Sequence, residues 1–456
     1  MENIIDITNE YYLEKAPIKK AIRHLSIPMM IGMSIGTVYN IINAYFIGLL
    51  HNTEMLSAIT LGLPIFTILM AFGNVFGVGG GTYITRLIAK SEINKAKRVA
   101  SYTVFASIVA GIIIATISLF VMNPLMKLLG TNDITFNLTK NYSIALFISG
   151  FTIVLNFALE QIVRSEGASK ESMYGMGVSA LVNLIFDPLL ILFFNLNVVG
   201  AALAMSIANL ASAIYYIYYL EKKSEHLRGF IGGFKLSLKE QWEIYKIGIS
   251  ELLQMSFMIV TILLLNNYCM EYGDNVIAAF GVALRIVQVP EFLSMGIFLG
   301  IIPLLAYNFS NKNFLRLKTA IKEAAKYIGI ISFLFVAIVY ILRVPIIRLF
   351  TNQSSVVRIG TYILIAMLIS ALFNGFTGLL MGIFQASGQA VPTTIMAVAQ
   401  GILYIPVVII AHHFLGLHGV IWSSTITEVI TCITGIVLFA QFNRKIKKLD
   451  SNLVSL

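Results

Sequence analysis

Twelve long apolar stretches dominate this chain, and each is long enough to cross a bilayer as a helix. About 20 consecutive apolar residues are needed, because a helix rises only about 1.5 Å per residue. We place the stretches at residues 25–50, 54–80, 99–122, 138–160, 173–195, 197–220, 243–270, 276–302, 321–342, 358–384, 391–413 and 417–441. Of the 456 residues, 58% are hydrophobic and 12% are charged, which excludes an ordinary water-soluble protein. The predicted fold class is therefore an all-α integral membrane protein with twelve transmembrane helices.

The distribution of basic residues predicts the orientation of these helices. An even number of spans places both termini on one side of the membrane. Of the 32 Lys and Arg residues, Arg285 falls deep inside a span, and five fall in loops or at span ends on the side opposite the termini: Lys127, Lys140, Arg343, Arg348 and Arg358. Because basic loops stay in the cytoplasm, we expect both termini to be cytoplasmic in a multi-pass cell-membrane protein. Topology thus accounts for the net charge of +10, and no nucleic-acid partner is expected.

The chain consists of two related halves. Arg98 corresponds to Lys318, Thr131 to Thr351 and Tyr142 to Tyr362, at a constant spacing. Repeats with an even number of spans run in the same direction, which predicts two pseudo-symmetric six-helix lobes. The expected divisions are a cytoplasmic lead-in (1–24), an N-lobe (25–220), a cytoplasmic connector (221–246), a C-lobe (247–441) and a cytoplasmic tail (442–456).

A glycine-rich run, Gly77-Val-Gly79-Gly80-Gly81, ends the second stretch. It follows no predicted strand and is not followed by Lys-Ser/Thr, so it does not fit a phosphate-binding loop. Small residues let helix backbones approach closely in membranes, and we therefore predict close helix packing or a kink here.

Asp187 is the first candidate for a functional residue. A carboxylate within the apolar stretch 173–195 is costly, and such residues usually belong to ion pathways or proton relays. Asn183 lies four residues earlier on the same helical face, and Pro188 removes a backbone donor and tends to free a carbonyl nearby. The alternative is a helix-packing hydrogen bond beside a proline kink.

The second half has its own polar residues inside predicted spans. They are Glu251, Gln254, Arg285, Gln288, Glu291 and Glu428. Arg285, Gln288 and Glu291 are three residues apart, so they form a drifting stripe on one helix. We consider these residues candidates for a substrate cavity, while a structural Arg–Glu clamp explains the stripe equally well.

Several motifs spread over nearly the whole chain resemble those of one transporter family. They are Tyr45-Phe-Ile-Gly48, Phe76-Gly-Val-Gly79 with Gly81-Thr-Tyr-Ile84, Leu159-Glu-Gln161, Asp187-Pro188, Asn197-Val-Val-Gly-Ala-Ala202, Arg285 with Val287-Gln288 and Pro290-Glu291, Ala306-Tyr-Asn-Phe309, and Gly419-Val-Ile-Trp-Ser423. By these motifs the chain resembles the multidrug and toxic compound extrusion (MATE) family, and most closely its Staphylococcus-type multidrug export branch. The resemblance implies a two-lobed antiporter that expels amphipathic cations in exchange for protons or sodium.

The resemblance also implies an N-lobe cation site around Asp187 and Asn183. In family members an acidic residue of the first helix joins this site, but the matching position here is Asn43, near Tyr39 and Asn40. A sixth-helix position that is often Thr is Met205. With one carboxylate left, we favour proton coupling over sodium, since a sodium cage needs several oxygen ligands while one protonatable Asp suffices for a proton cycle.

The leading prediction is thus antiport of amphipathic cationic small molecules by a monomeric protein in the lipid bilayer. The alternatives are a flippase for lipid-linked precursors and a membrane-embedded enzyme. A flippase would need several cavity cations, whereas only Arg285 lies deep within a span, away from its ends. The enzyme is least favoured, because no His-Glu-x-x-His motif occurs, and the one Gly-x-Ser-x-Gly match, Gly32-Met-Ser-Ile-Gly36, lies within a predicted span and not at a strand-to-helix turn. Cys269 and Cys432 are too few for a metal cluster, and no metal site or cofactor is expected beyond H⁺ or Na⁺ as the coupling ion.

Overall fold

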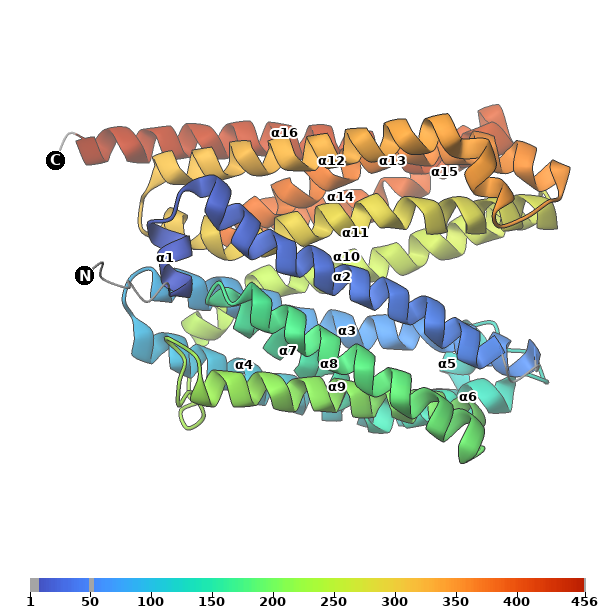
Figure 1. The fold of residues 1–456 in the computed structure, drawn as a ribbon, viewed down its shortest axis with the longest axis horizontal. Coiled ribbons are helices and arrows are strands. Elements are labelled where there is room, and N and C mark those ends of the chain that lie inside the picture. Colours follow the sequence, from blue (N-terminus) through green and yellow to red (C-terminus); the bar gives the residue numbers. More distant parts are fainter. Residues whose placement is uncertain (1–7, 49–52, 455–456) are drawn as a thin grey trace, which may run out of the picture. The chain divides into compact units, whose positions relative to one another are not determined.

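The computed structural model describes residues 8–48 and 53–454, except the side chains at 37, 39–41, 43–45, 47, 48, 53 and 451–454. This part of the chain is all-helical, which confirms the predicted fold class (Figure 1). The helices are α1 (Asn9–Glu14), α2 (Ile18–Gly48), α3 (Thr53–Ile88), α4 (Ile93–Phe120), α5 (Met122–Leu128), α6 (Phe136–Ile148), α7 (Gly150–Ser165), α8 (Ser169–Pro188), the π-helix η1 (Leu189–Phe193), α9 (Asn197–Lys222), α10 (Leu238–Met270), α11 (Asp274–Ser310), α12 (Phe314–Arg348), α13 (Ser354–Ala386), α14 (Ala390–Ile402), α15 (Tyr404–Leu415) and α16 (Leu417–Val454).

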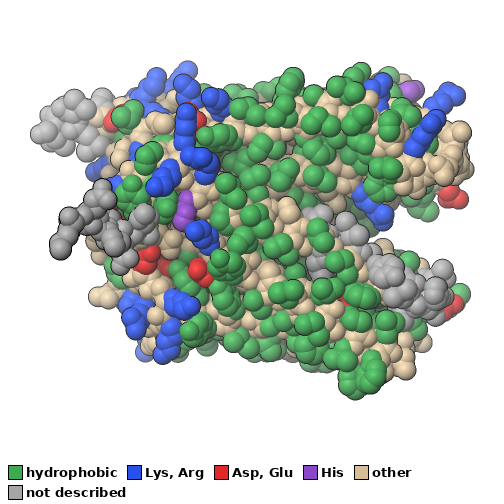
Figure 2. All heavy atoms as spheres, viewed as in Figure 1, with side chains coloured by type: hydrophobic (Ala, Val, Ile, Leu, Met, Phe, Trp, Pro, Cys, Tyr) green, Lys and Arg blue, Asp and Glu red, His purple; other side chains and the backbone are tan. Residues whose placement is uncertain are grey.

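Each predicted span coincides with one helix or with two consecutive helices. Within the described residues, ten helical segments are long and apolar enough to cross a membrane, and α6 with α7, bent by 53°, makes an eleventh. Helix α2 matches the first predicted span. Hydrophobic side chains cover much of the visible face, while Lys and Arg gather toward the helix ends (Figure 2). This distribution is typical of helices whose middle faces lipid.

Several helices extend well beyond the predicted spans. Helix α2 begins at Ile18 rather than at residue 25, and α16 continues to Val454 although the tail was predicted to start at 442. At about 1.5 Å per residue, the 38 residues of α16 reach about 57 Å, nearly twice the hydrocarbon thickness of about 30 Å. Hydropathy locates the part of a helix in the membrane, whereas the helix itself continues into water.

By their internal contacts the residues form two compact units. Unit 1 contains Met1–Ala16 and Ile31–Leu252, and unit 2 contains Pro17–Met30 and Leu253–Leu456. The predicted lobes divided at the connector, residues 221–246. In the structure the division instead falls inside two helices, because the start of α2 belongs to unit 2 and the start of α10 belongs to unit 1.

The start of α2 packs closely on α11 within unit 2. The Ser26 hydroxyl donates a 3.3 Å hydrogen bond to the carbonyl oxygen of Ile297. A Cβ added at Gly300 would lie 2.7 Å from the carbonyl oxygen of Leu25, so only glycine permits this approach. The backbones of α2 and α11 approach closely here, although the two helices are far apart in the sequence. This close packing explains why the start of α2 belongs to unit 2.

The start of α10 packs in the same manner on α3 within unit 1. A Cβ added at Gly248 would lie 1.9 Å from the carbonyl oxygen of Val75, and one at Gly79 would lie 2.1 Å from that of Ile244. The predicted role of the glycine-rich run in helix packing is thus confirmed at Gly79. The neighbouring Gly80 and Gly81 likewise leave no room for a Cβ beside α4 and α7.

Candidate functional site

Asp187 lies at the end of α8, where the helix changes its hydrogen-bonding pattern. Pro188 is the last residue of α8, and the wider π-helix η1 follows directly. Because proline has no backbone N–H, the regular helical ladder is interrupted at this point. The side chains of Asp187 and Asn183 are only 1% and 3% exposed, so the two residues share a buried face as predicted.

Tyr142 of α6 is a neighbour of Asp187 that sequence reasoning did not assign to the site. It is fully buried, and it interacts electrostatically with the Asp187 carboxyl. Its hydroxyl has no hydrogen-bond partner among the described residues. The ring is held against α3, where a Cβ added at Gly62 would lie 2.4 Å from it. The only signal in the sequence was the correspondence of Tyr142 with Tyr362 in the repeat.

The remaining predicted members of this site are on α2 and α9. Tyr39, Asn40 and Asn43 lie within α2, but their side chains are outside the described residues, so their contact with Asp187 stays a prediction. Met205 of α9 is half-buried against the apolar core of unit 1, which also contains Tyr142. The structure thus brings together Asp187, Asn183 and Tyr142, a group that contains both a carboxyl and a phenol.

A buried ion pair in unit 1 was also missed. Arg164 and Glu160 of α7 are 3.2 Å apart between Nη1 and Oε1, and both side chains are almost fully buried. Gln161 donates a 3.2 Å hydrogen bond to Asn74 of α3 and accepts one from Arg164. The i,i+4 spacing of Glu160 and Arg164 was the available signal. Burial on this scale is visible only after α3 and α7 have packed.

Glu251 belongs to this unit and not to the predicted C-lobe. It lies on the part of α10 that packs in unit 1, it is 8% exposed, and it interacts electrostatically with Arg164. Its predicted place in the C-lobe is therefore corrected, whereas its role in a substrate cavity stays a prediction. Glycine-mediated packing of α10 on α3 causes the difference.

Three polar side chains of unit 2 form a hydrogen-bonded group, on α10, α14 and α16, and Glu291 of α11 interacts with it electrostatically. Gln254 Nε2 donates to Gln400 Oε1 over 2.9 Å, and Gln400 Nε2 reaches Glu428 Oε2 at 3.5 Å. Glu291 interacts electrostatically with Glu428, which is 7% exposed. Glu428 is thus a buried carboxylate that accepts a hydrogen bond from an amide, and Glu291 is a partly buried carboxylate within electrostatic range of it. Negative charge of this kind attracts an organic cation.

Arg285 and Gln288 stand apart from this group. Both side chains are exposed, and within the described part of the chain no ion pair includes Arg285. The Arg–Glu clamp considered from their spacing is therefore not formed. Spacing of three residues brings side chains to neighbouring positions on a helix, but the drift of the stripe leaves Arg285 and Glu291 on different faces.

Glu166 is a further buried carboxyl, in the turn between α7 and α8 and outside the membrane spans. Its Oε1 accepts hydrogen bonds from the Ser224 hydroxyl at 2.6 Å and from the backbone N–H groups of His226 and Leu227 at 3.1 and 2.9 Å. Burial raises the pKa of Glu166 to about 7, although these three hydrogen bonds act in the opposite direction. This residue holds the connector against α7 and α8.

Comparison with known proteins gives consistent matches over almost the whole chain. The profile of the MatE family matches residues 28–189 and 247–410. The chain is 42% identical over 429 residues to the multidrug export protein MepA of Staphylococcus aureus (strain MRSA252), covering 94% of this chain and 95% of that protein. It is also 42% identical over 421 residues to MepA of Staphylococcus haemolyticus (strain JCSC1435), covering 92% and 93%.

Solved structures show the same similarity. A multidrug resistance MATE family transporter of the MOP superfamily, in an outward-facing conformation, matches with a TM-score of 0.88 and 26% identity, over 96% of this chain and 98% of that one. A MOP superfamily transporter from Pyrococcus furiosus matches with the same TM-score, identity and coverage, and its binding pocket is described as having reverse polarity.

Proposed function

Because the chain belongs to the MatE family of membrane transporters, and not to a family of enzymes, we propose that it exports drugs across the cell membrane. The observation that carries this proposal is the 42% identity, over 94% of the chain, to a protein named for multidrug export. The proposed substrates are amphipathic organic cations, exchanged for protons by alternating access of two lobes, with both termini in the cytoplasm.

The group around Asp187 supports ion coupling in unit 1. A carboxyl changes between a charged and a neutral form by exchanging one proton, so Asp187 alone suffices as a proton carrier. Asn183 shares its buried face, and the Tyr142 phenol lies within electrostatic range. We propose that these residues, with Tyr39, Asn40 and Asn43 of α2, form the coupling site. Sodium is the alternative coupling ion.

The polar group of unit 2 supports recognition of cations. Hydrogen bonds through Gln254, Gln400 and Glu428 connect three helices, Glu291 of α11 lies within electrostatic range, and the two carboxyl groups attract positive charge. Methionine and aromatic side chains adapt to ligands of different shape and make favourable contacts with organic cations. We propose that Glu428 and Glu291 are the principal contacts for the charge of the drug.

The test is transport by the purified chain in proteoliposomes. Ethidium movement is followed by fluorescence while either a proton gradient or a sodium gradient is imposed. We expect ethidium transport to follow the proton gradient and to stop when a protonophore is added. Transport that follows sodium alone would reject proton coupling, and no transport of any tested cation under either gradient would reject the proposed substrate class.

A further inference from the structure

We propose that a basic pocket at the ends of α3, α4 and α10 binds the phosphate headgroup of an anionic phospholipid. The pocket lies within unit 1 and has a volume of about 440 Å³. Its charged lining consists of the cations Arg86, Lys90, Lys95 and Lys239 and the carboxylates Glu240 and Glu243. This site is distinct from the groups around Asp187 and Glu428.

The two carboxylates of the pocket already have partners in the protein. Glu240 accepts hydrogen bonds from the backbone N–H and the hydroxyl of Ser237, both at 2.8 Å, and lies 3.7 Å from Lys95. Glu243 is paired with Arg86 at 3.3 Å and also with Lys246. Both carboxylates of the lining are thus already paired within the protein, without any ligand.

Two lysines of the pocket provide positive charge that these pairs do not neutralise. Lys90 and Lys239 are exposed, and neither takes part in an ion pair within the portion of the chain that is described. Lys90 follows the end of α3, whereas Lys239 is in the first turn of α10. A ligand between them would gain two cationic contacts without displacing any existing partner.

Arg86 provides a donor that still needs an acceptor. Its Nε donates to the carbonyl oxygen of Thr82 at 3.2 Å, and Nη1 donates to Glu243 at 3.3 Å. Its Nη2 is buried and has no hydrogen-bond partner among the described residues. The guanidinium is also held 5.3 Å from the centre of the Tyr83 ring. A phosphate oxygen is the acceptor that such a fixed guanidinium binds best.

The position of the pocket favours a lipid over a free anion. Helix α3 ends at Ile88, α4 begins at Ile93 and α10 begins at Leu238, so these helix ends surround the pocket just beyond the predicted spans 54–80, 99–122 and 243–270. The ends of spans lie at the level of the lipid headgroups. Basic pockets between helices on the cytoplasmic side suit anionic headgroups, whose acyl chains supply further binding energy in the bilayer.

The test measures lipid retention by the full chain. The purified protein is equilibrated with equal amounts of phosphatidylglycerol and phosphatidylcholine, and the bound lipids are counted by native mass spectrometry. We expect the wild type to retain one phosphatidylglycerol in preference to phosphatidylcholine. The Lys90→Gln/Lys239→Gln variant should reduce this preference by roughly tenfold or more, because two of the basic contacts with the anionic lipid are lost.

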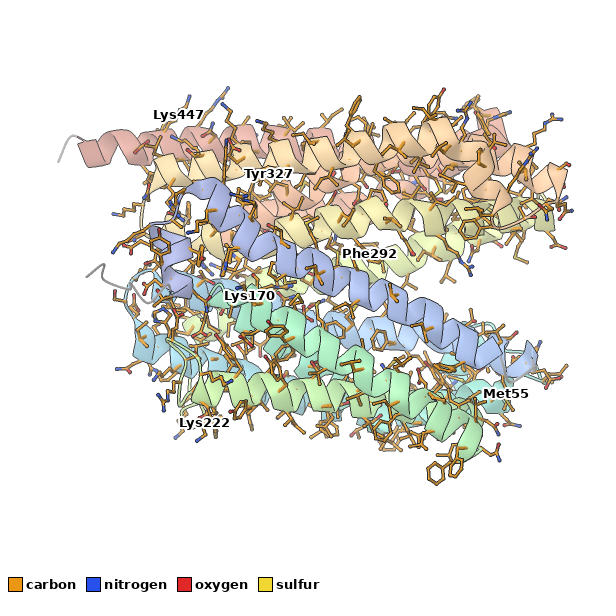
Figure 3. The ribbon with its side chains drawn as sticks, viewed as in Figure 1. Met55, Lys170, Lys222, Phe292, Tyr327 and Lys447 are labelled. Carbon is orange, nitrogen blue, oxygen red and sulfur yellow. The ribbon has the colours of Figure 1, made fainter. Side chains whose placement is uncertain are left out.

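The matched control removes two exposed lysines from helix ends of the same unit that do not line the pocket. These are Lys170 at the start of α8 and Lys222 at the end of α9 (Figure 3). We expect Lys170→Gln/Lys222→Gln to retain the wild-type preference. Equal losses in both double variants would show only a general effect of charge and would overturn the proposal.

A second arm distinguishes a lipid from free phosphate. Inorganic phosphate is added to the wild type, with sodium chloride of equal ionic strength as the reference. Retention of phosphatidylglycerol in both solutions supports a lipid site. Specific release of the lipid by inorganic phosphate, or no preference for phosphatidylglycerol at the start, would contradict the lipid assignment.

Discussion

At the scale of single residues, we expect ion coupling to depend on one group, the carboxyl of Asp187. The substitution Asp187→Asn keeps the size of the side chain but traps it in a neutral form. We expect gradient-driven efflux to fall to the leak rate, while drug binding to the purified protein persists because the unit 2 contacts remain. Efflux in proteoliposomes and binding in detergent are the two measurements.

The control for this variant is Asp133→Asn, which removes an exposed carboxylate from the loop before α6. It should transport at the wild-type rate. If Asp187→Asn also pumps drug at that rate against a gradient, the coupling site is elsewhere in the protein.

We expect the negative charge of Glu428 to contribute to the binding of cationic drugs. Glu428→Gln keeps an acceptor for Gln400 but removes the negative charge. Since electrostatic attraction scales with ligand charge, the loss of binding free energy should be roughly twice as large for divalent as for monovalent cations. Binding of both classes is measured by calorimetry, with Asp274→Asn, an exposed carboxylate of α11, as the control. Equal losses for both classes would indicate a structural role instead.

Glu166 makes stability depend on pH. Its pKa is about 7 in the folded protein against an ordinary value of 4.5, so the folded state binds more protons between these values. Stability therefore falls as pH rises from 4.5 to 7, by at most about 3 kcal/mol. Glu166→Gln should remove this loss and should unfold at a higher temperature than wild type at pH 8.

Unfolding temperatures of wild type and variant at pH 5 and pH 8 test this prediction. The difference between the two proteins isolates Glu166 from the nearby ionisable groups Glu10, Glu225 and His226. Glu92→Gln, at an exposed position outside this cluster, should keep the wild-type pH profile. The prediction fails if the unfolding temperature of Glu166→Gln changes between pH 5 and pH 8 as much as that of the wild type.

At the scale of elements, glycines set the distance between helices. Gly248→Ala would place a Cβ 1.9 Å from a backbone oxygen of α3, so α10 has to move. We expect a loss of about 1–3 kcal/mol in stability, seen as a lower unfolding temperature in detergent. In Gly177→Ala the new Cβ meets nothing within 4 Å, so this variant should be neutral or slightly more stable. Equal stability of the two variants would contradict this account.

The break between α6 and α7 shows what an apolar pattern does not reveal. The stretch 138–160 was predicted as one span, yet the helix bends by 53° at Ser149. The Ser149 hydroxyl donates to the carbonyl oxygen of Ala145 at 2.6 Å and also bonds to Ser206 of α9. A hydroxyl that competes for backbone groups bends a helix without changing its hydropathy.

At the scale of the whole molecule, the proposed orientation is open to a direct test. Cysteines introduced at Asp133, before α6, and at Lys235, in the connector, are both at exposed positions. We expect them to react with a membrane-impermeant maleimide from opposite sides, Lys235→Cys only from the cytoplasm. The native Cys269 and Cys432 are buried and serve as the unlabelled background. Labelling of both positions from outside the cell would contradict the twelve-span topology.

The amino-acid sequence was sufficient for the fold class, the family and the buried face of Asp187 and Asn183. Each apolar stretch forms its own backbone hydrogen bonds in lipid, so a span is a local property of the chain. The cost of a carboxylate in such a span is equally local, which is why Asp187 was found without a structure.

Packing between helices far apart in the sequence settled the rest. It placed Tyr142 within electrostatic range of Asp187, buried Arg164 with Glu160, and assigned Glu251 to unit 1. It also left Arg285 without the predicted clamp. These outcomes depend on which glycine faces which backbone, as at Gly248 and Val75, and on where a helix bends. Hydropathy and spacing describe each helix separately, whereas contact distances between helices exist only in the folded chain.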